Sequence, residues 1–392
     1  MTKPSSYHHL PVSELQNAAT PLYYYDLNLL HRTLDEIRRH TADLPCRVHY
    51  AVKANGNPRI LKEIASQGWL GTDLVSGGEI QAALDAGFKA GEMTYSGVGK
   101  TDREIRLGLT HNIGCFNVES IPELEVINAI AGEMGKVANV AIRTNPDIDA
   151  HTHKYITTGT ADNKFGIPIE MLDHVVGQAI AMPNIHLKGL HFHIGSQITT
   201  MQPYVMLCET ANRLMDHFDA MGIHFEMVNV GGGLGIDYEH PDENEIPDFA
   251  QYFGVFKRRL KLRDGQLLHF ELGRAIVGQC GTLVSHVTYV KANRGKKFVI
   301  LDAGMSDLIR PALYGARHLV QNMTATPGDN SDLEHYEIVG PMCESSDVFA
   351  GDCLLPETRR GDLMAIRSAG AYGESMASCY NMRPLPASMF SE

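Results

Sequence analysis

The feature that most constrains the fold of this chain is the regular alternation of short apolar runs with helical patterns. The runs are the length of strands, and the segments between them have the apolar spacing of amphipathic helices. The eight runs occupy residues 48–53, 72–76, 93–96, 115–118, 140–145, 187–193, 227–230 and 268–271. Eight strand–helix repeats predict a closed (β/α)8 barrel of the TIM type. An open, doubly wound sheet is the alternative.

After residue 281 the pattern changes. Expected strands at residues 282–290, 297–301 and 337–339 follow one another without long helices, and turn residues gather at 326–330. This pattern predicts a second, mostly β domain, a barrel or a sandwich. We therefore expect a barrel over residues 25–280 and a β domain formed by residues 1–24 and 281–392.

Polar side chains gather on one face of the expected strands. Side chains alternate between the two faces of a strand, and most barrels fill their interior with aliphatic residues. An interior rich in ionisable groups therefore predicts an active site. The residues that share the face of Lys53 are Asp73, Arg143, Asn145, His191, His193, Asn229, His269 and Glu271, whereas Leu74, Ile142, Leu190, Phe192, Val228, Val230, Leu268 and Phe270 lie on the opposite face.

Lys53 closes the run His49-Tyr50-Ala51-Val52-Lys53. An unpaired ammonium group is costly to bury, so a lysine here needs an explanation. A desolvated lysine loses its proton readily and can condense with an aldehyde. Lys53 is therefore a candidate nucleophile.

Three glycine-containing loops follow the last three barrel strands. They are residues 230–235, His193-Ile194-Gly195-Ser196 and Glu271-Leu272-Gly273-Arg274. Bare backbone N–H groups can bind an anion, and late barrel strands commonly hold phosphate. One such loop alone would indicate only a turn. Together they predict one bound phosphate.

A lysine that captures an aldehyde, a phosphate site and a carboxylate are what pyridoxal 5'-phosphate requires. Glu271 would keep the pyridine nitrogen protonated, which makes the ring an electron sink. His193 could stack on the ring.

Composition excludes several other classes. The formal net charge of -12 argues against nucleic acid and acidic membrane surfaces as partners. No apolar run has the length of a membrane span, and the first residues lack the apolar core of a secretion signal. The seven cysteines are scattered without a C-x-x-C pair, which argues against a disulfide framework and a metal site. We expect a cytoplasmic protein.

The ordered motifs of the chain resemble those of fold-type III pyridoxal-phosphate decarboxylases, in the alanine racemase and ornithine decarboxylase-like superfamily. The closest resemblance is to the diaminopimelate decarboxylases. The motifs are Tyr50-Ala51-Val52-Lys53-Ala54-Asn55, Arg143-Thr144-Asn145-Pro146-Asp147, Asn163-Lys164-Phe165-Gly166, His191-Phe192-His193-Ile194-Gly195-Ser196-Gln197, residues 231–235, Glu271-Leu272-Gly273-Arg274, Arg310-Pro311-Ala312-Leu313-Tyr314, Cys343-Glu344-Ser345-Ser346-Asp347 and Ala369-Gly370-Ala371-Tyr372-Gly373. Leu272 stands where the family usually has proline.

The resemblance implies a role for each site residue. Lys53, His193 and Cys343 would be catalytic, with Lys53 bonded to the cofactor and Cys343 returning a proton after carbon dioxide leaves. The cofactor would be bound by Lys53, Asp73, His193, Ser196, Gly232, Gly233, Glu271, Leu272, Gly273, Arg274 and Tyr372. The substrate would be bound by Arg274, Arg310, Tyr314, Glu344 and Tyr372.

The implied reaction converts meso-2,6-diaminopimelate to L-lysine and carbon dioxide, the last step of lysine biosynthesis. The family forms homodimers with shared active sites, so Cys343 and Glu344 would come from the partner chain. The resemblance also implies that the barrel of residues 25–280 binds the cofactor, and that the β domain of residues 1–24 and 281–392 completes the active site and the dimer interface. The alternatives are a decarboxylase of another basic amino acid, such as ornithine or arginine, and a non-catalytic homologue that binds a partner. A racemase on the same barrel is disfavoured by the Cys343-Glu344 motif.

Overall fold

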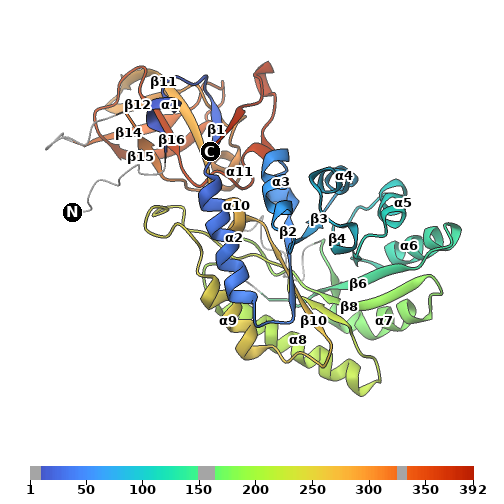
Figure 1. The fold of residues 1–392 in the computed structure, drawn as a ribbon. Coiled ribbons are helices and arrows are strands. Elements are labelled where there is room, and N and C mark those ends of the chain that lie inside the picture. Colours follow the sequence, from blue (N-terminus) through green and yellow to red (C-terminus); the bar gives the residue numbers. More distant parts are fainter. Residues whose placement is uncertain (1–9, 149–163, 325–332) are drawn as a thin grey trace. The chain divides into compact units, whose positions relative to one another are not determined.

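The computed structural model of this 392-residue chain describes residues 10–148, 164–324 and 333–392. The chain divides into two compact units (Figure 1). The first consists of Met1–Asp35, Ile236–Pro247 and Arg274–Glu392, and the second of Glu36–Gly235 and Asp248–Gly273. The division into functional domains at residues 25 and 280 stays a prediction. Within the described residues, no helix combines the length and the apolar character that crossing a membrane requires.

The second unit contains a closed parallel barrel. Its strands pair in the order β5-β4-β3-β2-β10-β9-β8-β6, and β5 also pairs with β6, which closes the ring. The predicted TIM-type barrel is therefore confirmed, and the open sheet is excluded. The barrel strands are β2 (Cys46–Ala51), β3 (Gly71–Leu74), β4 (Met93–Tyr95), β5 (Cys115–Val118), β6 (Ala138–Asn145), β8 (Ile185–His191), β9 (Met227–Asn229) and β10 (Leu267–Leu272), while β7 (Ile167–Pro168) pairs with β6 outside the ring.

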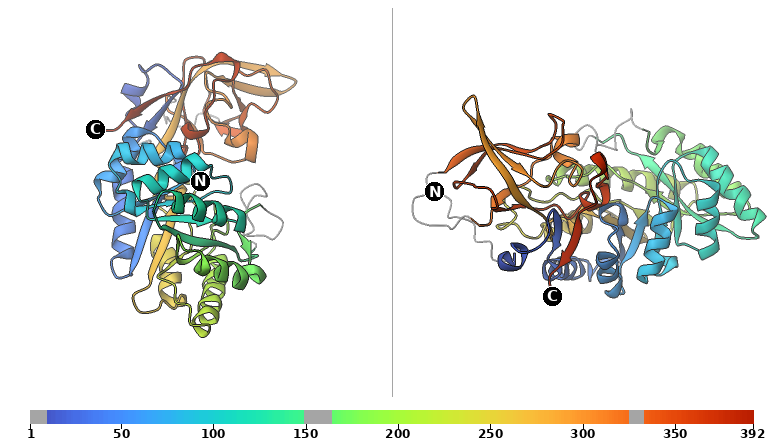
Figure 2. Two further views of the ribbon diagram at one scale, coloured as in Figure 1. Left: turned by 90° about the vertical axis from the view of Figure 1, so that its right-hand side faces the viewer. Right: turned by 90° about the horizontal axis from the view of Figure 1, so that it is seen from above.

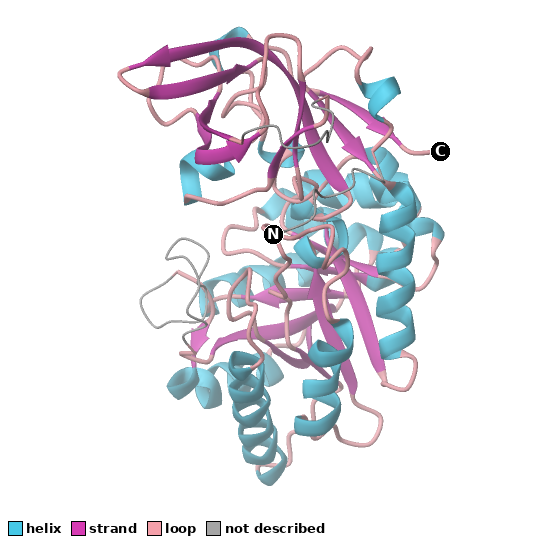
Figure 3. Ribbon diagram, turned by 90° about the vertical axis from the view of Figure 1, so that its left-hand side faces the viewer, coloured by secondary structure: helices cyan, strands magenta, loops and turns pink. Residues whose placement is uncertain are grey.

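Helices surround these strands (Figure 3). Several begin at a residue whose side chain accepts a hydrogen bond from the first turn, as Ser76, Thr101, Ser120 and Asp248 do. The helices are α3 (Pro58–Ser66), α4 (Gly77–Ala86), α5 (Asp102–His111), α6 (Ile121–Glu133), α7 (Leu172–Ala181), α8 (Gln202–Ala220) and α9 (Phe249–Arg259), and α2 (Leu27–Thr41) carries the chain from the first unit into the second.

The apolar faces of the barrel strands pack outward against the helices, as strand alternation predicts. Phe270 of β10 makes ring contacts with Tyr252, Phe253 and Phe256 of α9 at centroid distances of 5.8, 4.9 and 5.1 Å. Because these rings bury a large apolar area, they fix the outward face of β10. The alternate residues of β10, including Glu271, are thereby directed into the barrel.

The first unit contains a mixed sheet. Its strands follow the order β13-β16-β11-β12-β14-β15, and β1 pairs antiparallel with β11 and parallel with β17. Figure 2 shows β11 and β12, in orange, as a long hairpin. The predicted turn at 326–330 lies outside the described residues. The elements are α1 (Val12–Leu15), β1 (Leu22–Tyr25), α10 (Arg274–Val277), β11 (Gly281–Asn293), β12 (Lys296–Leu301), α11 (Arg310–Tyr314), β13 (Val320–Asn322), β14 (Glu334–Val339), β15 (Val348–Leu355), β16 (Leu363–Ile366) and β17 (Ala387–Phe390).

Candidate active site

Lys53 lies just beyond the end of its barrel strand. The predicted strand at 48–53 is too long, because β2 ends at Ala51 and Lys53 falls in the 3-10 turn η1 (Val52–Ala54). Pairing with β3 extends only to Ala51, opposite Asp73, so the chain is free to turn there. Lys53 Nζ lies 3.3 Å from Asp73 Oδ2, and the lysine side chain is 38% exposed while that of Asp73 is fully buried. The amine therefore combines a buried counter-charge with access from outside.

A buried hydrogen-bond chain leads from Asp73 to Glu271. Ser96 Oγ donates to Asp73 Oδ1 over 2.7 Å, and Asn117 Nδ2 donates to Ser96 Oγ over 2.9 Å and to Glu271 Oε1 over 3.1 Å. Sequence reasoning did not identify Ser96 or Asn117. Asn117 lies in the short apolar run of residues 115–118 and shares a strand face with Cys115. This position was the only feature of the sequence that could have indicated it.

Glu271 is held as a carboxylate by several donors. Asn229 Nδ2 donates to Oε1 over 2.7 Å, and His191 Nε2 donates to Oε2 over 3.0 Å. Burial alone would raise the pKa of Glu271, but the charge and hydrogen bond of His191, followed by the charge of Lys53, hold it below its usual value. Burial, and then the charge of Glu271, raise the pKa of Asp73. Of the two carboxyl groups buried in the barrel, Glu271 therefore has a lowered pKa and Asp73 a raised one.

His193 follows β8 as a neutral imidazole. Burial, followed by the positive charges of Lys53 and Arg143, holds its pKa well below the usual value. The backbone N–H of Gly232 donates to Nδ1 over 3.3 Å, which requires that nitrogen to be unprotonated. A neutral ring suits the predicted stacking role, which stays a prediction.

Arg143 is neutralised inside the barrel unit. Its Nη1 donates to Glu119 Oε1 over 2.7 Å, and the guanidinium lies 4.6 Å from the ring centroid of Phe165. The backbone N–H of Gly166 donates to the second oxygen of Glu119 over 2.9 Å. This pair ties β6 to the motif residues Phe165 and Gly166; Asn163 of that motif lies outside the described residues.

The loops after β8, β9 and β10 contact one another through their backbones. Ile198 and Leu234 form a parallel bridge, and Ile198 N–H donates to Gly233 O over 2.9 Å. Gly233 has a φ of +96°, which a residue with a side chain rarely adopts. A Cβ on Gly232 would lie 1.8 Å from Glu271 O, so only glycine permits this approach. The structure thus brings together the loops carrying Ser196, Gly232, Gly233 and Glu271; Leu272 and Gly273 continue the last of them.

The first unit holds a separate cluster around Tyr238, which sequence reasoning did not identify. Arg274 Nη1 donates to Tyr238 Oη over 2.5 Å, and the Arg310 guanidinium lies 4.8 Å from the Tyr238 ring centroid. Arg310 Nη1 also donates to His318 Nε2 over 2.9 Å. Burial, followed by the charge of Arg310, lowers the pKa of His318 to about 3, so His318 stays neutral and can accept. Tyr238 and His318 lie outside helices and strands, so no periodic pattern could have predicted where their side chains point.

Tyr372 and Tyr314 belong to the same unit. The Arg274 guanidinium lies 4.8 Å from the Tyr372 ring centroid. Tyr372 has a φ of +56°, an unusual conformation for a bulky residue and one that clusters at functional sites. Tyr314 ends the short helix α11, which begins with Arg310.

Cys343 and Glu344 lie on an exposed loop of the first unit. Asp347 fixes this loop by accepting the backbone N–H groups of Met305 and Met342 over 2.6 and 2.7 Å. Both Cys343 and Glu344 are exposed, and Glu344 accepts a hydrogen bond from Tyr380. Their side chains are therefore free to face another molecule.

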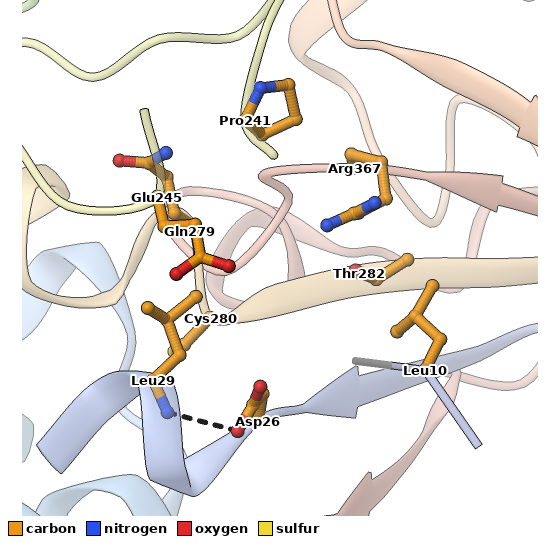
Figure 4. A pocket seen from close by; sticks show the side chains of 9 residues that line it. All are labelled: Leu10, Asp26, Leu29, Pro241, Glu245, Gln279, Cys280, Thr282 and Arg367. Carbon is orange, nitrogen blue, oxygen red and sulfur yellow. Dashed lines mark hydrogen bonds between the residues drawn. The ribbon is translucent and has the colours of Figure 1, made fainter. Parts of the chain in front are cut away.

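A cavity of the first unit contains none of the predicted site residues (Figure 4). It has a volume of about 340 Å³ including space open to solvent. Arg367 and Asp26 line it, and Asp26 accepts the backbone N–H of Leu29 over 3.0 Å. The complete lining is Leu10, Asp26, Leu29, Pro241, Glu245, Gln279, Cys280, Thr282 and Arg367.

The barrel residues fit pyridoxal phosphate. They supply an amine, an anionic carboxylate, a neutral imidazole and glycine-containing loops that meet after the last strands, which are the groups the cofactor needs. Within the described part of the chain, the buried atoms His191 Nδ1 and Asn117 Oδ1 have no hydrogen-bond partner. Buried polar atoms are rarely left unpaired, so a polar ligand or water is expected beside them.

Comparison with known proteins agrees with this geometry. Residues 28–278 match the family described as pyridoxal-dependent decarboxylase, pyridoxal binding domain. A diaminopimelate decarboxylase of Bacteroides thetaiotaomicron is 55% identical over 383 residues, which cover 97% of this chain and 98% of the relative. One of Vibrio cholerae is 42% identical over 376 residues, covering 96% of this chain and 88% of the relative.

A solved structure extends the likeness to three dimensions. The crystal structure of diaminopimelate decarboxylase from Helicobacter pylori complexed with L-lysine has a TM-score of 0.90 and 39% identity, and the match covers 97% of this chain and 93% of that one. The chain therefore belongs to the pyridoxal-dependent decarboxylases, and within them to the diaminopimelate decarboxylase family.

Proposed function

We propose that this chain uses pyridoxal 5'-phosphate to convert meso-2,6-diaminopimelate to L-lysine and carbon dioxide, the last step of lysine biosynthesis. The observation that carries the proposal is that buried hydrogen bonds connect Asp73, the partner of Lys53, to Glu271 inside the barrel. The loops that carry Ser196 and Gly233 pair with each other beyond the strand ends. The identity of 55% to a named diaminopimelate decarboxylase supports the choice of substrate.

The barrel residues hold the cofactor in this proposal. Lys53 would bind its aldehyde, Glu271 would pair with its ring nitrogen and His193 would pack on its ring. When bound, the cofactor accepts the electrons released by decarboxylation. Because Glu271 stays anionic, it would favour a proton on the ring nitrogen. The phosphate is bound by Ser196, Gly232, Gly233, Leu272, Gly273, Arg274 and Tyr372, and Asp73 pairs with Lys53.

The arginine cluster binds the substrate. Arg310 is 5% exposed and forms no ion pair within the described residues, and its Nε has no partner there. A buried guanidinium without a carboxylate is costly, so an anionic ligand is the natural complement. Two guanidinium groups, Arg274 and Arg310, suit a substrate with two carboxylates. Tyr314 and Tyr372 flank them, and Glu344 meets the distal ammonium group.

Cys343 returns a proton to the carbon that loses carbon dioxide. We propose that Cys343 and Glu344 act in the partner's site, since both are exposed in this chain. The enzyme would then be a homodimer with shared sites. We further propose that it works in the cytoplasm.

The substrate is tested by offering meso-diaminopimelate, lysine, ornithine and arginine separately and measuring carbon dioxide. Only diaminopimelate should release gas. Arg310→Leu should lower kcat/KM for diaminopimelate by about 100-fold, because a buried charge contact is lost. The control is Arg317→Leu, whose arginine is 86% exposed and pairs with Glu239 at 3.7 Å; it should behave as wild type. Gas from ornithine or arginine alone would favour the other basic amino acid decarboxylases.

The cofactor attachment has its own test. Borohydride reduction of the holoenzyme followed by peptide mass mapping should place the pyridoxyl group on Lys53. Lys53→Ala should lose the visible absorbance of the bound cofactor. A tag on another lysine, or none, would refute the assignment and favour the non-catalytic homologue.

A further inference from the structure

Asn117 occupies a branching point inside the barrel. It is fully buried in β5, and its Nδ2 donates to Glu271 Oε1 over 3.1 Å and to Ser96 Oγ over 2.9 Å. An ionised carboxylate accepts hydrogen bonds only, so the nitrogen and not the oxygen of the amide must face Glu271. Both hydrogens of the amide are thereby used. The orientation of Asn117 is fixed by the charge of its neighbour.

The second branch reaches the other carboxyl group. Because Ser96 Oγ accepts from Asn117, its own hydrogen is free to point to Asp73 Oδ1, 2.7 Å away. Asp73 in turn lies 3.3 Å from Lys53 Nζ through its second oxygen. One amide therefore directs donors toward both carboxyl groups of the barrel interior.

The backbone of this residue is also anchored. Lys100 Nζ, whose side chain is 1% exposed, donates to Asn117 O over 2.7 Å and to Gly97 O over 2.8 Å. Lys100 pairs with Glu123 at the same time. The position of Asn117 is thus held through its backbone carbonyl as well as through its side chain.

Two carboxyl groups in one buried space repel each other, and each needs its own donors to stay in place. Glu271 receives Asn229 and His191 in addition to Asn117. Asp73 has only the Ser96 hydroxyl and Lys53 among the described residues. Beside Lys53 and His191, the titratable groups that interact electrostatically with this pair are His49, Glu79, Cys115, His193, Tyr252 and His269.

We propose that Asn117 is a positioning residue that aims Glu271 at the ring nitrogen of the cofactor and, through Ser96, aims Asp73 at the amine of Lys53. The role rests on the proposed function, since it supposes pyridoxal phosphate in the barrel. Asn117 touches neither reacting group and acts through the two carboxylates. Its loss removes one of the donors of Glu271 and leaves the Ser96 hydroxyl without the donor that directs its hydrogen toward Asp73.

The direct test is a double-mutant cycle on cofactor affinity, measured by equilibrium dialysis with pyridoxal phosphate. Asn117→Leu keeps the size of the side chain and removes its donors. It should weaken cofactor binding about tenfold, the change expected from one lost charge-assisted hydrogen bond. In a Glu271→Met background the same substitution should weaken cofactor binding by a clearly smaller factor, because only the branch through Ser96 then remains to be lost. Equal losses in both backgrounds would overturn the proposal.

Asn322→Leu is the matched control. Asn322 is also fully buried, and its Nδ2 donates to a hydroxyl, Thr358 Oγ1, over 3.1 Å and to a carboxylate, Asp362 Oδ2, over 2.8 Å. It lies in β13 of the first unit, among none of the cofactor residues. Its loss should lower stability without changing cofactor affinity. If both leucine variants weaken the cofactor equally, Asn117 has only a structural role.

Ser96→Ala tests the second branch and removes few atoms, so it keeps the inference testable if Asn117→Leu fails to fold. Asp73 loses its hydroxyl donor, and the acid limb of the kcat/KM profile should move about one pH unit higher. If the acid limb of Ser96→Ala does not move, the part of the proposal in which Asn117 acts on Asp73 through Ser96 is wrong. Wild-type enzyme without decarboxylase activity would refute the proposed function, while the affinity cycle would still decide the role of Asn117.

Discussion

At the scale of single residues, two buried arginines differ in whether a carboxylate neutralises their charge. Arg143 is 6% exposed and forms a 2.7 Å ion pair with Glu119, whereas Arg310 is 5% exposed and contacts the neutral groups Tyr238 and His318. A buried charge is tolerated when it is paired and costly when it is not. Arg143 is therefore a structural residue of the barrel, and Arg310 is the one suited to an anionic ligand.

The Arg143 pair predicts a stability effect. Arg143→Met should destabilise the protein by about 3–5 kcal/mol, because it leaves Glu119 buried without its counter-charge. Arg59→Met should cost less than about 1 kcal/mol, since Arg59 is 58% exposed and pairs with Glu63 one helical turn away. Urea denaturation monitored by tryptophan fluorescence and circular dichroism measures both. Similar losses for the two variants would contradict the structural role assigned to Arg143.

At the scale of elements, Glu104 joins the starts of two barrel helices. Its Oε2 accepts the backbone N–H of Thr101 over 3.0 Å and closes the capping box of α5. Its Oε1 accepts the backbone N–H of Gly77, the first residue of α4, over 2.8 Å. Helix N-termini favour negative charge, so one carboxylate stabilises both ends. The hydrogen bond from Gly77 is the main reason that the pKa of Glu104 falls to about 2.

This arrangement predicts a pH-dependent effect of Glu104→Gln. The folded state has the lower pKa, so the carboxylate contributes its stability fully above its usual value of 4.5 and loses it as the pH falls toward about 2. At pH 7 the variant should be less stable by about 1 kcal/mol, the usual value of a helix cap. Urea midpoints between pH 7 and pH 3 should show the two proteins converging. A constant difference would mean that the charge is not responsible.

The elements also show what the sequence could and could not predict. The eight barrel strands and the inward direction of Asp73, His191 and Glu271 follow from apolar runs and strand parity alone. The turn at Lys53 was missed, because where β2 stops depends on its pairing with β3. Asn117 was missed because one amide in a four-residue strand has no periodic signal. The roles assigned to the site residues stay predictions.

At the scale of the whole molecule, the residues to which we assign chemistry are distributed over both compact units. Lys53 and Glu271 belong to the second unit, and Arg310 and Cys343 to the first. Cys343 is exposed on the surface of its own chain, so its thiol is accessible to a second copy of the protein. Mixing two inactive variants decides whether Cys343 serves the site of its own chain or that of a second copy.

Coexpression of Lys53→Ala and Cys343→Ala chains with different tags tests the shared site. Each variant alone should be inactive, and Cys343→Ala should still bind the cofactor. Random association makes about half of the dimers mixed, and each mixed dimer has one complete site if Cys343 acts on the partner's Lys53. The mixture should then recover about one quarter of the wild-type rate. If Cys343 acts within its own chain, every site of a mixed dimer lacks one group. Dimers purified through both tags would then stay inactive, and the proposed exchange of Cys343 between chains would be wrong.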